Sequence, residues 1–167
     1  MERYCPYCMH LIQPGKPCPN CKRDPETYRP ESRQLPPGTL LQERYVLGRA
    51  LGAGGFGITY LATQTLTDKK VAIKEFFFKE YCERDNVSGT VTVPTTSKKK
   101  FVEKFQKKFL KEAKISSDLN HKNIIRVLDV FQENDTSYYS MEYIIGKSLA
   151  QEINAKGKID GKKLYQL

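Results

Sequence analysis

The stretch Leu51–Ala62 reads LGAGGFGITYLA and contains a GxGxxG pattern at Gly52, Gly54 and Gly57. Glycine lets the backbone approach a ligand closely, because it has no side chain to hold the ligand away. The pattern is therefore typical of loops that cover phosphate groups, although ordinary glycine turns contain it as well. Its meaning depends on the sequence before and after it.

Three runs rich in β-forming residues surround the glycines. They are RYVLGRALG (44–52), GITYLATQT (57–65) and KKVAIKEFFF (69–78), separated by glycines or by the polar turn LTDKK. This order predicts an antiparallel meander, with the glycine pattern between two strands. A dinucleotide-binding fold instead opens a helix at the third glycine, and a P-loop carries GKS or GKT, so neither fits. Two interpretations remain: a hairpin whose glycines let the backbone lie over phosphates, and an ordinary glycine hairpin.

A helix and two further strands are expected after this meander. FVEKFQKKFLKEAKISSDL (101–119) has no Gly or Pro and places apolar residues near helical spacing, which predicts a helix. IIRVLDVFQEN (124–134) and TSYYSMEYII (136–145) read as two strands around a polar turn, and NVSGTVTVPTTS (86–97) as a small hairpin. Three strands, one helix and two strands predict an α+β fold.

The chain of 167 residues carries a net charge of +9, with 28 Lys and Arg against 19 Asp and Glu. A positive excess favours anionic partners such as nucleotides, nucleic acid or a membrane surface. The excess is concentrated in one segment, for which a solvated helix face is the simplest interpretation. The lysines of this segment are Lys98, Lys99, Lys100, Lys104, Lys107, Lys108, Lys111 and Lys114.

Two CxxC units, CPYC (5–8) and CPNC (18–21), stand near the start of the chain. Each unit can place two thiolates on one cation and two units complete a tetrahedron, which predicts a four-cysteine zinc ribbon over residues 1–24. Because protein fills all four positions, the zinc is expected to be structural; redox-active or incidental thiols are the other interpretation. The predicted ligands are Cys5, Cys8, Cys18 and Cys21.

The stretch 25–39 is rich in proline and charge, which predicts an extended linker between the ribbon and the larger fold. No run of eighteen apolar residues occurs, and the start MERYCPYC lacks the apolar core of a signal peptide. We therefore expect no membrane segment in this chain and a cytoplasmic location. Thiols in that compartment are reduced, which agrees with metal ligation.

LGAGGFGITYLA followed by VAIK (71–74) resembles the amino-terminal lobe of a protein kinase and is most similar to bacterial serine/threonine kinases. The resemblance extends from Leu40 to the last residue and implies a five-stranded antiparallel sheet plus an αC helix over residues 40–145. It implies the catalytic residues Lys74 and Glu112, with the carboxylate holding the lysine at the α- and β-phosphates. An ordinary surface pair is the other interpretation of these two residues.

The same resemblance implies ATP as the cofactor, with Mg²⁺ in an intact kinase. Met141 in SMEYIIGKSL is the implied gatekeeper, and the backbone of Glu142 and Ile144 would bind the adenine edge. Ala72 would cover the adenine, and Thr59 stands where the family usually has Val. The implied phosphate loop consists of Gly52, Ala53, Gly54, Gly55, Phe56 and Gly57, with Lys74 beside it.

Residues 146–167 are expected to form the hinge exit and the start of a carboxy-terminal lobe. Neither HRD nor DFG occurs, although these motifs supply the catalytic Asp and the magnesium ligands in the family. The resemblance therefore implies the N-lobe of a serine/threonine kinase with a truncated C-lobe, inactive as this fragment. Its implied partners are ATP, the missing C-lobe and a protein substrate. The alternative is a non-catalytic zinc-ribbon module that docks to protein or nucleic acid, with nucleic acid the less expected partner.

Overall fold

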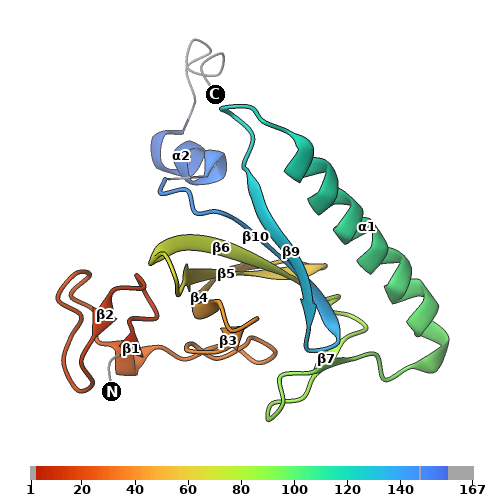
Figure 1. Ribbon diagram of the computed structural model, residues 1–167, viewed down its shortest axis with the longest axis horizontal. Coiled ribbons are helices and arrows are strands. Elements are labelled where there is room, and N and C mark those ends of the chain that lie inside the picture. Colours follow the sequence, from red (N-terminus) through yellow and green to blue (C-terminus); the bar gives the residue numbers. More distant parts are fainter. Residues whose placement is uncertain (1–2, 147, 158–167) are drawn as a thin grey trace.

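The computed structural model describes residues 3–146 and 148–157, and its centre is one antiparallel sheet. The strand order is β3-β4-β5-β6-β10-β9 (Figure 1). The five predicted strands are all present, and β3 adds a sixth, two-residue strand at one edge. The strands are β3 (Leu40–Leu41), β4 (Tyr45–Ala53), β5 (Gly57–Gln64), β6 (Lys69–Phe76), β9 (Val127–Glu133) and β10 (Thr136–Glu142).

Helix α1 (Lys99–Asp118) confirms the helix expected at 101–119 and packs against β9 and β10. Its buried residues, Val102, Phe109 and Ala113, follow helical spacing, so one face of the helix is apolar. The lysines lie outside this face and are exposed. Segments η2 (Thr96–Lys98), β7 (Glu83–Arg84) and β8 (Val91–Thr92) precede α1, and α2 (Leu149–Lys156) follows β10.

The amino-terminal ribbon is built on β1 (Arg3–Tyr4) and β2 (Leu11–Ile12), which pair antiparallel. Figure 1 shows the ribbon and α1 on opposite sides of the sheet. A second small core lies in the ribbon, with Cys5, Ile12 and Cys18 buried. No helix within residues 3–146 and 148–157 combines the length and the apolar character that crossing a bilayer requires.

The ribbon contacts β4 just before the glycine loop. The Arg49 amide donates a hydrogen bond to the Pro6 carbonyl at 2.8 Å, and the Ala50 amide donates to the Tyr28 hydroxyl at 3.0 Å. At Gly48 a Cβ atom would lie 2.8 Å from the Pro6 carbonyl oxygen, so only glycine permits this approach. The β4–β5 pairing has two irregularities in the same region. They leave the amides of Arg49 and Ala50 free to donate hydrogen bonds to groups outside the sheet.

The proline-rich segment between ribbon and sheet is largely exposed but is anchored at several points. It begins with the 3₁₀ helix η1 (Pro25–Thr27). Leu35 is buried in the main core, and its amide donates to the Tyr60 hydroxyl at 3.0 Å. The Gly38 amide donates to the Leu47 carbonyl at 2.7 Å. These contacts fix the segment to the sheet.

A fully buried carboxylate, Glu75 on β6, lies at the centre of the sheet. It accepts hydrogen bonds from the hydroxyls of Tyr60 on β5 (3.0 Å) and Tyr138 on β10 (2.7 Å). Burial, together with the charge of Glu75, raises the pKa of both phenols, so they stay protonated and act as donors. The third partner is Arg84, whose Nη2 lies 2.6 Å from the Glu75 carboxylate.

Arg84 comes from β7, outside the main sheet, and its side chain is only 2% exposed. Burial alone would lower its pKa, but the adjacent Glu75 carboxylate outweighs this and raises it. The guanidinium also donates to the carbonyls of Arg33 and Gly89, at 2.7 Å each. One cation therefore holds the packed segment, the β7–β8 hairpin and the sheet together.

We predict that Arg84→Ala lowers the free energy of unfolding by about 3–5 kcal/mol, because it leaves Glu75 buried and unpaired. Arg44→Ala is the matched control: Arg44 lies 2.6 Å from Asp129, but both side chains are partly exposed, so its loss costs about 1 kcal/mol or less. Denaturant unfolding measures both. Equal losses for the two variants contradict the prediction; if Arg84→Ala does not fold, Arg84→Met with Glu75→Gln restores folding.

Candidate functional site

A cavity of about 660 Å³ lies between the tip of the β4–β5 hairpin and α1. Its wall brings together the glycine loop, two further residues expected to contact ATP and the carboxylate expected to hold the lysine, although they come from four separate elements. Aromatic residues of β6 and α1 complete the wall. The predicted residues that line it are Gly52, Ala53, Gly54, Gly55, Phe56, Gly57, Thr59, Lys74 and Glu112.

Internal packing requires glycine at only one of the four glycine positions of the loop. A Cβ atom at Gly57 would lie 2.5 Å from the Glu75 carbonyl oxygen, so strand packing requires glycine there. At Gly52, Gly54 and Gly55 a Cβ atom would meet nothing within 4 Å, and none of the three has a left-handed φ. Packing within the protein therefore does not require glycine at these three positions.

The tip of the loop is anchored to its surroundings. The Phe77 amide donates to the Phe56 carbonyl at 3.1 Å, and the Lys79 amide donates to the Gly55 carbonyl at 3.0 Å. The Phe56 ring stacks on Phe105 of α1, with centroids 5.3 Å apart and an interplanar angle of 8°. The loop is thus ordered above the cavity and linked to α1.

Lys74 extends from β6 into the cavity, where Thr59 on β5 and Tyr139 on β10 are its strand neighbours. Its Nζ lies 5.6 Å from the centroid of Tyr139 and 5.7 Å from that of Phe109. Glu112 lines the same cavity, but in the described part of the chain it does not form an ion pair with Lys74. The two aromatic faces stabilise the ammonium in this arrangement.

The residues expected at the adenine lie outside this cavity, farther along the sheet. Met141 on β10 pairs with Ala72 on β6, which is buried. The Glu142 amide donates to the Arg126 carbonyl at 3.1 Å. Ile144 follows the end of β10, is 66% exposed, and has no backbone hydrogen-bond partner among the described residues. Its peptide groups are therefore free to bind a ligand edge.

Each CxxC unit of the ribbon forms the same tight turn. The Met9 amide donates to the Cys5 carbonyl and the Lys22 amide to the Cys18 carbonyl, both at 2.8 Å. Met9 and Lys22 both have a left-handed backbone, with φ of 56° and 62°. The two turns therefore present their cysteines to a common point in the same way.

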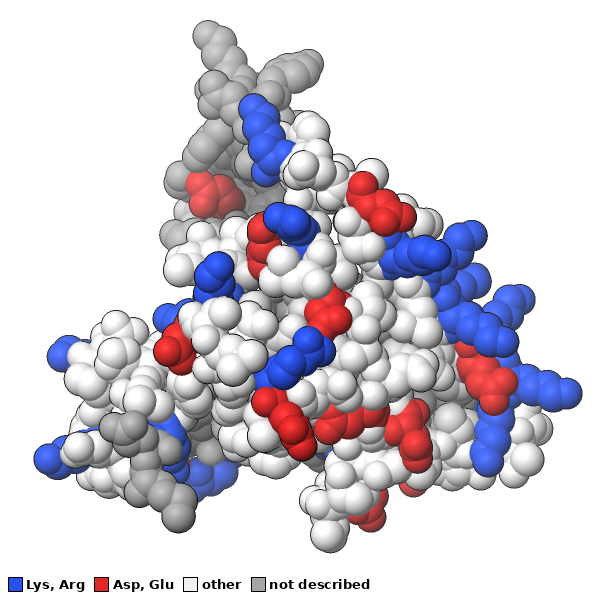
Figure 2. Space-filling view, in the orientation of Figure 1, with Lys and Arg blue, Asp and Glu red and all other residues white. Residues whose placement is uncertain are grey.

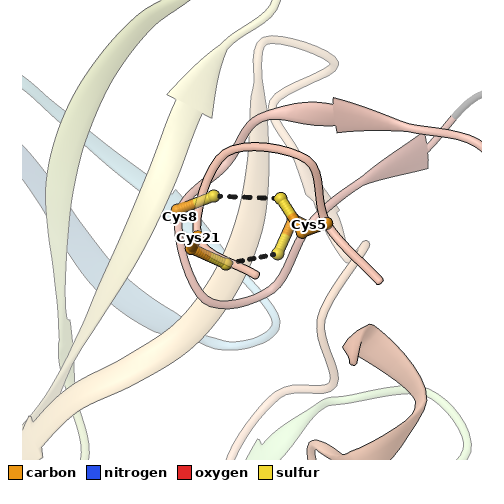
Figure 3. Close-up of side chains that lie close together, drawn as sticks. Cys5, Cys8 and Cys21 are labelled. Carbon is orange, nitrogen blue, oxygen red and sulfur yellow. Dashed lines mark hydrogen bonds between the residues drawn. The ribbon is translucent and has the colours of Figure 1, made fainter. Parts of the chain in front are cut away.

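The four cysteine sulfurs lie within 4.8 Å of one another (Figure 3). Cys5 and Cys21 are 3.7 Å apart, and Cys8 and Cys18 are 3.6 Å apart. Zn–S bonds of about 2.3 Å in a tetrahedron give sulfur separations of roughly 3.8 Å, so these distances fit one zinc ion. The donor set and the geometry are both suitable for the metal.

Burial and backbone hydrogen bonds act in opposite directions on the pKa of the first cysteine of each turn. Burial raises the pKa of Cys5 to about 12, although hydrogen bonds from the backbone of Tyr7 and Cys8 act to lower it. At Cys18 burial acts in the same direction, but the backbone of Cys21 and Asn20 outweighs it and lowers the pKa to about 7. Thiolates are the form in which cysteine binds a metal.

Four residues of the cavity wall, Phe76, Phe105, Lys108 and Phe109, were not expected from the sequence to line it, and two of them, Phe105 and Lys108, share a helix face with Glu112. Their spacing from Glu112, seven and four residues, puts all three on one helix face. That spacing was visible in the sequence, but the lysine-rich composition pointed to a solvated face.

A family model of the protein kinase domain matches residues 45–167. The chain is 32% identical over 130 residues to serine/threonine-protein kinase PrkC of Bacillus subtilis and 35% identical over 107 residues to serine/threonine-protein kinase PknD of Chlamydia trachomatis. The alignments cover 78% and 64% of this chain but only 17% and 9% of those relatives. The solved structure of the apo form of PpkA-294 matches with a TM-score of 0.74 and 26% identity, over 81% of this chain and 48% of that one.

Proposed function

The chain belongs to the protein kinase family, and we propose that residues 40–145 are the ATP-binding N-lobe of a serine/threonine-protein kinase. In the intact protein the N-lobe would take part in phosphoryl transfer from ATP to serine or threonine of a protein substrate. The observation that carries the proposal is the cavity shared by the glycine loop and Lys74. Three glycines that internal packing does not require line this cavity, as expected for backbone that lies over phosphates.

In this proposal the loop amides and Lys74 bind the phosphates of ATP, and Glu112 orients Lys74 once α1 brings the two into contact. The side chain of Thr59 packs beside the nucleotide. Mg²⁺ bound to the phosphates offsets their negative charge. The peptide groups of Ile144, which bond to no backbone group among residues 3–146 and 148–157, support its assignment to the adenine edge.

The adenine would lie next to Ala72 and Met141, with the backbone of Glu142 as its second hydrogen-bonding group. This placement follows the register of the sheet, in which Ala72 and Met141 are opposite each other. Lys74 is two residues farther along β6, so the phosphates would extend from the adenine toward the loop tip.

Residues 1–24 would form a structural zinc ribbon, residues 25–39 its connection to the lobe, and residues 146–167 the hinge exit and the start of a second lobe. The four thiolates fit zinc in number, kind and separation. A four-thiolate site requires reduced cysteines, which supports a cytoplasmic location for the ribbon.

A polypeptide of these 167 residues contains neither HRD nor DFG, and we infer that on its own it transfers no phosphate. No group in these residues is assigned to hold the acceptor hydroxyl or to accept its proton. Phosphate incorporation into a protein substrate by the purified polypeptide is the result that overturns this inference.

We predict that the zinc-loaded chain binds MgATP and that Lys74→Ala lowers the affinity about tenfold, because a charged hydrogen bond to phosphate is lost. Lys70→Ala is the control, since Lys70 is an exposed lysine on the same strand that does not line the cavity. Isothermal titration calorimetry measures both variants. Equal ATP affinities for the two variants, or no ATP binding by the parent chain, refute the assignment.

We predict one zinc ion per chain, and that chelation increases hydrogen exchange at the Arg49 and Ala50 amides, whose partners lie on the ribbon and the segment after it. Metal analysis and exchange measured by mass spectrometry provide the two readouts. Cys18→Ser should lose the metal, whereas Cys82→Ser, a buried cysteine outside the cluster, should retain it. A chain that keeps Arg49 protected without metal contradicts the prediction.

A further inference from the structure

The lysines of residues 98–114 do not all lie in the same surroundings. Figure 2 shows blue side chains gathered along the side of the molecule that α1 occupies. Several of them border an outer groove on the helix, as a solvated lysine face would. Lys108 borders this groove and also lines the cavity beneath the glycine loop, which no other lysine of the segment does. This position indicates a role for Lys108 in the cavity.

Helix geometry turns Lys108 toward the loop. It lies three residues after Phe105 and four before Glu112, so the three side chains share one face of α1. Its Nζ lies 5.3 Å from the Phe105 ring centroid, and Phe105 stacks on Phe56 at the tip of the loop. A cation over this aromatic pair is held close to the place where the loop covers the cavity.

The wall of the cavity carries more positive than negative side chains. No carboxylate among the described residues forms an ion pair with Lys108 or with Lys74. Two ammonium groups and one carboxylate, that of Glu112, therefore line the cavity. An excess of positive charge in a concave site favours a ligand with several negative charges.

The register of the sheet gives the order of the groups along the cavity. Ala72 lies at the proposed adenine end, Lys74 follows on β6, and Phe77 bonds the Phe56 carbonyl at the loop tip. Phe77 follows Ala72 by five positions of extended chain, a span of about 17 Å. Lys108, which is tied to the loop tip through Phe105, therefore lies beyond Lys74 as seen from the adenine end.

We propose that Lys108 is a second phosphate-binding lysine, supplied by α1, whose ammonium binds the terminal phosphate of a nucleoside triphosphate beneath the glycine loop. This inference rests on the proposed ATP site. It gives the basic helix a role in the cavity: Lys74 binds the inner phosphates from the sheet, and Lys108 binds the outer one from the helix. Movement of α1 then affects nucleotide binding through two residues: Lys108, which contacts the phosphate, and Glu112, which orients Lys74.

Titration calorimetry of the zinc-loaded chain with MgATP and with AMP, at one fixed ionic strength, tests the proposal. Lys108→Ala should weaken ATP binding about five- to tenfold and leave AMP binding unchanged, because AMP lacks the terminal phosphates. Lys108→Arg, which keeps the charge, should stay within about threefold of the parent. Lys111→Ala is the matched control, since Lys111 is an exposed lysine of the same helix that borders only the outer groove.

The outcomes separate the two proposals. A parent chain that binds ATP, with equal ATP affinities for Lys108→Ala and Lys111→Ala, overturns the role of Lys108 and leaves the ATP site standing. Equal weakening of ATP and AMP by Lys108→Ala also overturns it, because the effect is then not at the terminal phosphate. A parent chain that binds no ATP overturns the proposed function and this inference with it.

Discussion

The Glu75 carboxylate lies in the core of the sheet with no exposed surface, and its negative charge has to be balanced there. Arg84 supplies the balancing charge from a hairpin outside the sheet, and two tyrosine hydroxyls supply further hydrogen bonds. Because Arg84 also bonds the backbone at Arg33 and Gly89, the same charge pair fixes the chain before the sheet and the chain after β6. Lys74 directly precedes Glu75 on β6, so the position of Lys74 depends on this pair.

That constraint extends to the candidate nucleotide site. The chain that leaves β6 bonds the tip of the glycine loop through the Phe77 and Lys79 amides before it reaches Arg84. The same chain leads into α1, whose Phe105 stacks on Phe56. On the opposite side the ribbon bonds β4 at Arg49. The loop is therefore held from the helix side and from the ribbon side, which agrees with a preorganised site for phosphates.

Local signals in the sequence were sufficient for the strands, the helix and the cysteine cluster. Period-two and helical patterns report the face that a segment buries, and CxxC spacing reports the ligand geometry, so each can be recognised within one segment. The Glu75–Arg84 pair could not be predicted this way, because its tyrosine partners come from other strands and an Arg in a polar stretch reads as a surface residue. Contact between Pro6 and Arg49 likewise joins segments distant in sequence. The resemblance predicted that Lys74 and Glu112 act together, and both line one cavity. Whether the two side chains form an ion pair depends on the position of α1, which no local sequence pattern encodes.

We propose that the glycine loop and the end of β10 bind the two ends of one ATP molecule. A titration of the ¹⁵N-labelled, zinc-loaded chain with MgATP, followed by nuclear magnetic resonance, tests this claim. The amides of Gly54, Gly55 and Phe56 should shift together with that of Ile144, along one saturating curve. Shifts confined to the exposed lysine segment of α1, with the loop and Ile144 unchanged, would contradict the claim and indicate non-specific binding of an anion to the basic helix.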